Sequence, residues 1–138
     1  MTRILILLLT LIVLDGCSVL KEQDTADPKR TYPEALGFAP ADLEQLLAGD
    51  HVPGSYDLTA YVVGISECPP DFACLVADHI QVAGSPHTDG PALMIGAEKP
   101  SQFDMDEEYI LSIEVFSEAF PESSQPHYVQ LLGYSEIN

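Results

Sequence analysis

The chain has 138 residues, which makes one domain at most. Hydrophobic residues make up 46% of the chain, so a small apolar core can form and disorder along the whole length is excluded. Five Lys and Arg stand against 22 Asp and Glu, and the net charge of −17 excludes a protein that binds nucleic acid by clamping phosphates with basic side chains.

Residues 1–16 have the pattern of a signal peptide. Arg3 gives the start a positive charge, and residues 4–14 are apolar apart from Thr10. A helix that crosses a bilayer needs about 20 apolar residues, so this run is too short to span one. The segment is therefore predicted to be removed after export.

The apolar run leads directly into Leu14, Asp15, Gly16 and Cys17. This stretch resembles the lipobox of bacterial lipoproteins, although Asp15 departs from the small, uncharged residue usual there. The resemblance implies that lipid is attached to the Cys17 sulfur, that cleavage precedes this residue, and that the protein is anchored in the cell envelope. Ser18 after the cysteine then indicates the outer membrane, facing the periplasm or the surface. Ordinary secretion with an incidental Cys17 is the alternative.

Residues 17–31 are predicted to be a flexible tether, because they are mostly charged or polar. Removing the four acids that precede Arg30 leaves 18 of the 22, against a single base, Lys99. The predicted domain, residues 32–138, therefore carries the charge of −17 by itself. Three interpretations of this acidity stay open: cation binding, attraction of a basic protein, and adaptation to a salty medium.

The domain is predicted to open with a short helix and to continue as strands. Pro40 suits a first helical turn, three leucines follow i, i+3, i+4 spacing, and Gly49 ends the helix. Gly64 is a candidate β-bulge. Strands are expected at residues 58–65, 74–82, 92–97, 108–116 and 128–137.

Five short strands must bury an apolar face and two sheet edges, and closure into a small barrel achieves both. Residues 60–64, 74–78 and 109–115 resemble the strand pattern of OB-fold domains, especially exported bacterial ones that place a helix before the first strand. The resemblance implies a mainly all-β fold: a five-stranded OB-like barrel preceded by one short α-helix. An immunoglobulin-like sandwich is the competing fold, but it normally has seven strands.

Cys68 and Cys74 remain once Cys17 is assigned to lipid. An even pair of cysteines in an exported protein predicts a disulfide. A redox pair or half of a metal site is the alternative.

The candidate functional residues are few. The densest acidic run, with Asp104, Asp106, Glu107 and Glu108, is a candidate Ca²⁺ site, although it lacks the spacing of an EF-hand. A metal site from His79, His87 and Asp89 is geometrically possible, but surface histidines are expected. No catalytic residue is assigned.

The sequence therefore predicts a lipid-anchored envelope protein, not an enzyme, that acts as a binding or interaction module without a cofactor. Its partner would be a basic envelope protein or a small ligand, and nucleic acid is excluded. The alternatives are a Ca²⁺-dependent module and a small metal-dependent hydrolase.

Overall fold

The structure is a computed structural model that describes residues 31–120 and 122–137. The predicted signal peptide, the lipidation site Cys17 and nearly all of the predicted tether lie outside the described residues. Within the described part of the chain, no helix is long and apolar enough to span a membrane.

One short helix, α1 (Leu43–Ala48), precedes the strands, as predicted. The Asp42 carboxylate accepts a hydrogen bond from the Gln45 N–H at 3.1 Å and so caps the first turn. Gly49 ends the helix in the left-handed conformation, at φ 78°. Pro40 was expected in the first helical turn, and that expectation is wrong. It forms an isolated parallel bridge with Asp57 instead, because the Asp42 cap starts the helix two residues later.

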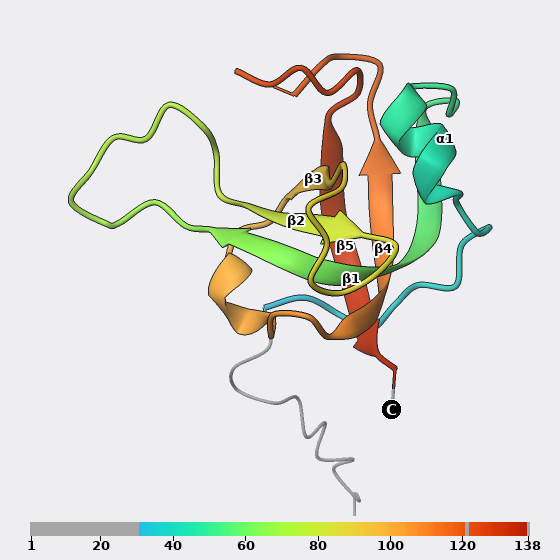
Figure 1. The fold of residues 1–138 in the computed structure, drawn as a ribbon, viewed down its shortest axis with the longest axis horizontal. Helices are drawn as coiled ribbons and strands as arrows, with labels where there is room; N and C mark the ends of the chain where they lie inside the picture. The colour runs from blue at the N-terminus through green and yellow to red at the C-terminus, as the bar shows by residue number, and fades with distance from the viewer. Residues whose placement is uncertain (1–30, 121, 138) are drawn as a thin grey trace, which may run out of the picture.

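Five strands close into a barrel in the order β1-β2-β3-β5-β4 (Figure 1). The predicted five-stranded, OB-like, mainly β fold is confirmed, and a single closed ring excludes the two-layer sandwich. A short 3-10 helix, η1 (Pro100–Gln102), connects β3 to β4. The strands are β1 (Gly54–Ser66), β2 (His79–Ala83), β3 (Leu93–Gly96), β4 (Glu108–Val115) and β5 (Val129–Glu136).

Strand β1 is long enough to pair with two neighbours. Its first part runs antiparallel to β4, and its second part runs antiparallel to β2. Tyr61 is the residue at which the two ladders meet, opposite both Ala83 and Glu108. The register between β1 and β2 shifts between Val62 and Gly64, which confirms the bulge predicted there.

Strand β2 is shorter than predicted. The sequence placed residues 74–78 in it, and the ladder with β1 instead begins where Ser66 faces His79. The Cys68 N–H, just past the end of β1, is taken by the Asp78 carboxylate at 2.7 Å and not by a strand backbone. Residues 67–78 therefore form a loop, called the β1–β2 loop below.

Apolar residues from every strand fill the interior of the barrel. In β1 every second residue is buried from Leu58 to Val62. In β4 the buried apolar residues recur at every second position from Tyr109 to Val115, with Ser112 also buried between them. Phe103, Tyr109 and Tyr134 close one end with ring centroids 4.6 to 5.8 Å apart. This packing accounts for the burial of Tyr109 and Tyr134.

Candidate functional site

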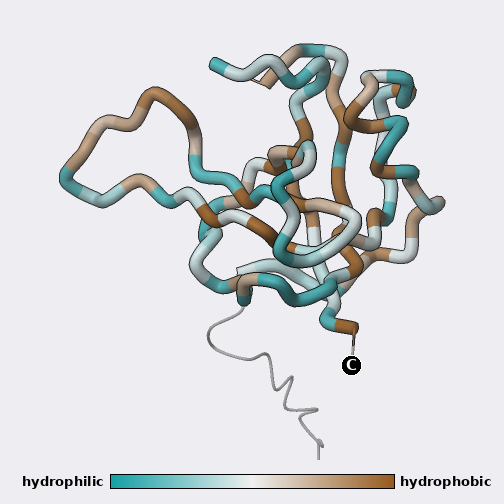
Figure 2. Tube along the Cα trace, in the orientation of Figure 1, coloured by the Kyte–Doolittle hydropathy of each residue, from teal (hydrophilic) through white to brown (hydrophobic). Residues whose placement is uncertain are grey.

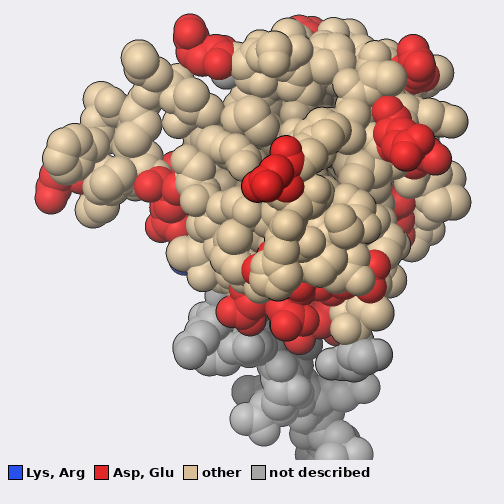
Figure 3. All heavy atoms as spheres, in the orientation of Figure 1, with Lys and Arg blue, Asp and Glu red and all other residues tan. Residues whose placement is uncertain are grey.

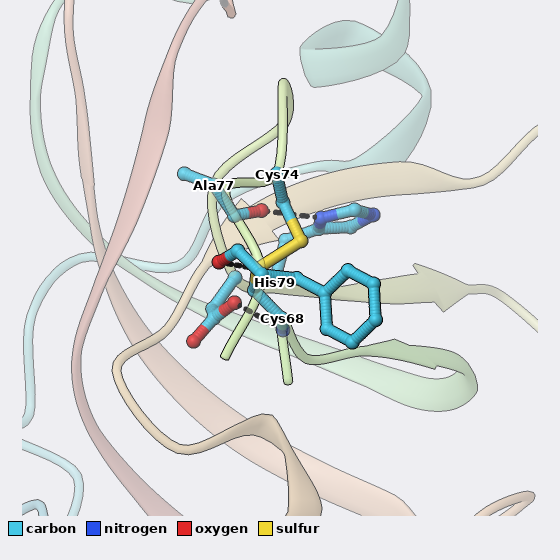
Figure 4. The surroundings of a disulfide bond; sticks show 6 residues. Cys68, Cys74, Ala77 and His79 are labelled. Atoms are coloured by element: carbon cyan, nitrogen blue, oxygen red, sulfur yellow. Dashed lines mark hydrogen bonds between the residues drawn. A yellow bond between two sulfur atoms is a disulfide. The ribbon is translucent and has the colours of Figure 1, made fainter. Parts of the chain in front are cut away.

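The most distinctive surface feature is the β1–β2 loop, which projects away from the barrel (Figure 1). A disulfide joins Cys68 to Cys74 with their Cα atoms 5.9 Å apart, and Figure 4 shows it beside Ala77 and His79. The predicted disulfide is thus present in the fold. It closes a ring of seven residues near the end of the hairpin.

Two carboxylates fix the base of the loop, one by a contact inside the loop and one by a contact with η1. Asp78 accepts the Cys68 N–H, and Glu67 accepts the Ser101 N–H from η1 at 3.1 Å. Hydrogen bonds from Ser101 lower the pKa of the fully exposed Glu67 carboxyl, with a smaller contribution from Lys99. The hydrogen bonds from Ser101 favour the ionised Glu67 carboxylate, so this contact between the loop base and η1 is present at neutral pH.

The outer part of the loop displays apolar side chains to solvent. Phe72 is 71% exposed and Leu75 is 88% exposed. Figure 2 shows brown, apolar stretches along this projecting segment. Within the loop the Phe72 N–H donates to the Pro69 carbonyl at 3.0 Å, which forms a local turn ahead of the disulfide. Two large apolar groups are therefore presented on a cross-linked support.

The sequence analysis identified the cysteines but missed Phe72 and Leu75. Residues 74–78 were assigned to a strand, where Leu75 would have been one member of an alternating pattern. The available signal was the proximity of Phe72 and Leu75 to two cysteines only six residues apart, because so small a ring leaves the side chains on it and beside it little room to pack inward.

The acidic turn predicted as a Ca²⁺ site is arranged differently from an ion cage. The Asp106 carboxylate makes two contacts with His87. Its Oδ2 lies 2.9 Å from the imidazole Nδ1, and its Oδ1 accepts a hydrogen bond from the His87 backbone N–H at 3.0 Å. Among residues 31–120 and 122–137, no group of three or more His, Cys, Asp or Glu side chains is arranged to hold a metal ion. The structure therefore gives the Ca²⁺ prediction no support.

Beside this turn lies a hollow of about 200 Å³, lined in part by Asp104, Glu107, Glu108 and Glu136. It is smaller than the roughly 300 to 1,000 Å³ usual for small-molecule sites. Four carboxylates around so small a space would repel an anionic ligand. The geometry does not single out a small molecule that would bind here.

The structure does not bring the four histidines together. His79 is 5% exposed, donates from Nδ1 to the Ala77 carbonyl at 2.8 Å (Figure 4), and packs against Phe120. The expectation that it lies on the surface is wrong, because it begins β2 inside the sheet. His87 is exposed and pairs with Asp106 rather than with Asp89.

The remaining two histidines make separate local contacts. His51 packs edge-on against Tyr56 with ring centroids 4.6 Å apart. His127 donates from Nε2 to the Gly49 carbonyl at 3.1 Å and so joins the β4–β5 connection to α1. The Nδ1 atom of His127 is buried without a hydrogen-bond partner among the described residues, and these contacts of the two imidazoles are made with residues other than histidine.

No protein-family model, curated protein sequence or solved structure matches the chain.

Proposed function

We propose that this chain is a lipid-anchored protein of the cell envelope that acts as a non-catalytic binding module. The signal sequence and the lipobox-like residues before Cys17 support the anchor, since acyl chains on one cysteine hold a protein at a membrane without a spanning helix. The disulfide supports an exported location, because such bonds persist in oxidising compartments.

The β1–β2 loop carries the proposal of a binding role. An exposed phenylalanine within the disulfide-closed ring, Phe72, and an exposed leucine next to Cys74, Leu75, both lie outside the core. Exposed apolar side chains that lie close together are typical of interaction sites. Loops fixed on a rigid scaffold are the usual carriers of binding residues. The separate settings of the histidines favour binding over hydrolysis.

Membrane fractionation tests the anchor. The full chain is expected in the membrane fraction and labelled by radioactive palmitate, whereas a Cys17→Ser variant is expected in the soluble exported fraction without label. Ser18→Ala is the matched control and should remain anchored. A wild-type chain found in the cytosol with residues 1–16 intact would contradict the proposal.

Chemical cross-linking of intact source cells tests the binding role. The tagged full chain is expected to purify with one envelope component in a fixed ratio, and without nucleic acid. The anchored chain recovered alone after cross-linking, or recovered with DNA or RNA at ordinary salt, would contradict it.

A further inference from the structure

We propose that the β1–β2 loop is a docking plug for a basic envelope protein: Phe72 and Leu75 enter an apolar socket whose rim carries Lys and Arg. The inference rests on the proposed binding function and goes further by naming the surface and the chemistry of the partner.

The plug has the composition of an interface centre. Large aromatic and aliphatic side chains that become fully desolvated in a partner pocket supply most of the binding energy of protein interfaces. Phe72 and Leu75 are both more than two thirds exposed and lie three residues apart. The projection of the loop lets them enter a recess that the barrel surface itself could not reach (Figures 1 and 2).

The plug is also held in shape before it binds. The Cys68–Cys74 disulfide, the turn closed by the Phe72 N–H, and the two adjacent prolines restrict the backbone. Asp78 and Glu67 fix the base to Cys68 and to η1. Restricting a loop in its bound shape lowers the entropy lost on association, which is the usual benefit of such cross-links.

Charge identifies the partner class. Asp71 is exposed next to Phe72, and Glu67 and Asp78 flank the ring. Figure 3 shows acidic groups at the far end of the projecting loop and where it joins the barrel. Lys99 contributes to lowering the pKa of Glu67. A socket that receives Phe72 must therefore accommodate Asp71 beside it, and a cationic rim does so favourably.

The same charges disfavour the other candidate occupants. A second copy of the chain also carries −17, so two loops or two barrels repel each other. A bilayer that accepted Phe72 would have to take the Asp71 carboxylate close to its headgroups, and anionic lipids repel it. Nucleic acid is repelled for the same reason.

Site-specific photo-cross-linking in living source cells tests the inference. The full, anchored chain carries p-benzoylphenylalanine in place of Phe72 in one strain and in place of Val52 in a second. Val52 is equally exposed, at 71%, but lies between α1 and β1, away from the loop. Position 72 is expected to give one protein adduct whose partner has a net positive charge, and position 52 is expected to give none.

Five results would overturn the inference. Lipid adducts alone at position 72 would identify a membrane-inserting loop, and adducts between two copies of the chain would identify self-association. A position-72 adduct with an acidic protein would refute the proposed charge complementarity. Adducts at position 52 with none at position 72 would leave the binding function standing and move its surface elsewhere. If neither position reacts and the anchored chain also purifies alone after chemical cross-linking, the proposed function itself fails.

Side-chain variants test the two parts of the plug separately. Leu75→Ala should lower the yield of the position-72 adduct by about tenfold or more, whereas Leu36→Ala, at another exposed leucine, should leave it unchanged. Asp71→Asn should lower the yield and weaken its dependence on salt, while Asp50→Asn, at an exposed acid beside α1, should not. Equal effects of Asp71→Asn and Asp50→Asn would show that a charged rim is not part of the interface.

Discussion

Gly49 joins the end of α1 to the β4–β5 connection, and two constraints act on it. It lies in the left-handed region, and a Cβ atom there would be 2.8 Å from Cγ of Pro126. Gly37 has nearly the same backbone conformation, at φ 74°, but has no atom within 4 Å of the corresponding position. Comparing substitutions at Gly37 and Gly49 therefore separates the cost of the left-handed backbone from the cost of a steric clash with Pro126.

We predict that Gly37→Ala lowers the free energy of unfolding by about 1–2 kcal/mol, the cost of a left-handed alanine. Gly49→Ala should lose about 1–3 kcal/mol more, because Pro126 must also move. Urea denaturation of both variants beside the wild type measures the difference. Equal losses would mean that the β4–β5 connection is not packed on Gly49.

Gln125 acts as a short substitute for a neighbouring strand. Its side-chain Oε1 accepts the Met94 N–H at 2.7 Å, and its Nε2 donates to the Met94 carbonyl at 2.9 Å and to the His127 carbonyl at 2.8 Å. The side chain thus satisfies both backbone groups of a residue in the middle of β3. It also fixes the β4–β5 connection to that strand.

We predict that Gln125→Ala costs about 1–3 kcal/mol of stability, because it leaves buried backbone groups without a partner. The Met94 amide should exchange its hydrogen faster in this variant. Gln45→Ala, on the exposed face of α1, is the control and should change stability by less than about 0.5 kcal/mol. An unchanged exchange rate at Met94 would show that solvent or another group replaces the glutamine.

At the scale of elements, the β1–β2 loop is stabilised by its cross-link and the barrel is not. None of the core residues comes from residues 67–78. Loss of the disulfide should therefore loosen the loop while the five strands persist. This separates the shape of the proposed plug from the integrity of the fold.

We predict that replacing Cys68 and Cys74 together with serine lowers the free energy of unfolding by about 2–3 kcal/mol, the chain-entropy value for so short a ring. A Cys17→Ser background keeps the predicted lipid site out of the comparison. Far-ultraviolet circular dichroism should still report the strands, and denaturant melts give the stability difference. Loss of the strand signal would mean that the cross-link is needed for the barrel itself.

At the scale of the whole molecule, buried phenols set the response to alkaline pH. Burial is the largest cause that raises the pKa of Tyr32, Tyr109 and Tyr128 above the ordinary value. For Tyr109 the nearby Asp104 and Glu136 carboxylates raise the pKa further, while the hydrogen bond from the Asp104 N–H opposes them. For Tyr128 the rise in pKa comes from burial.

Because these pKa values are higher in the folded protein, the unfolded chain releases the phenolic protons first, at about pH 10. The contribution of these groups to stability is complete below that pH and is lost as the pH rises above it. We predict a steeper alkaline loss of stability for the wild type than for Tyr128→Phe, measured by urea denaturation between about pH 8 and 11. Parallel curves would show that Tyr128 ionises freely in the folded state.

The pattern of single residues predicted much of the architecture. Alternating apolar positions in β1 and β4, the glycine at the β1 bulge, and the leucine spacing of α1 each report a local preference that the fold retains. The disulfide was predicted from the cysteine count together with the predicted export signal. The acidic turn was misjudged because sequence proximity brings carboxylates near one another without showing that Asp106 is committed to His87, 19 residues away.

The sequence by itself determined the fold class, the number of strands and the charge, because periodicity, turn residues and composition act within a few residues or on the chain as a whole. Only the tertiary structure decided that residues 74–78 leave the β2 ladder, that Phe72 and Leu75 face solvent, and that Gln125 completes β3. These outcomes depend on where distant backbone groups find their hydrogen-bond partners. That choice is made when the barrel closes, and no local pattern encodes it.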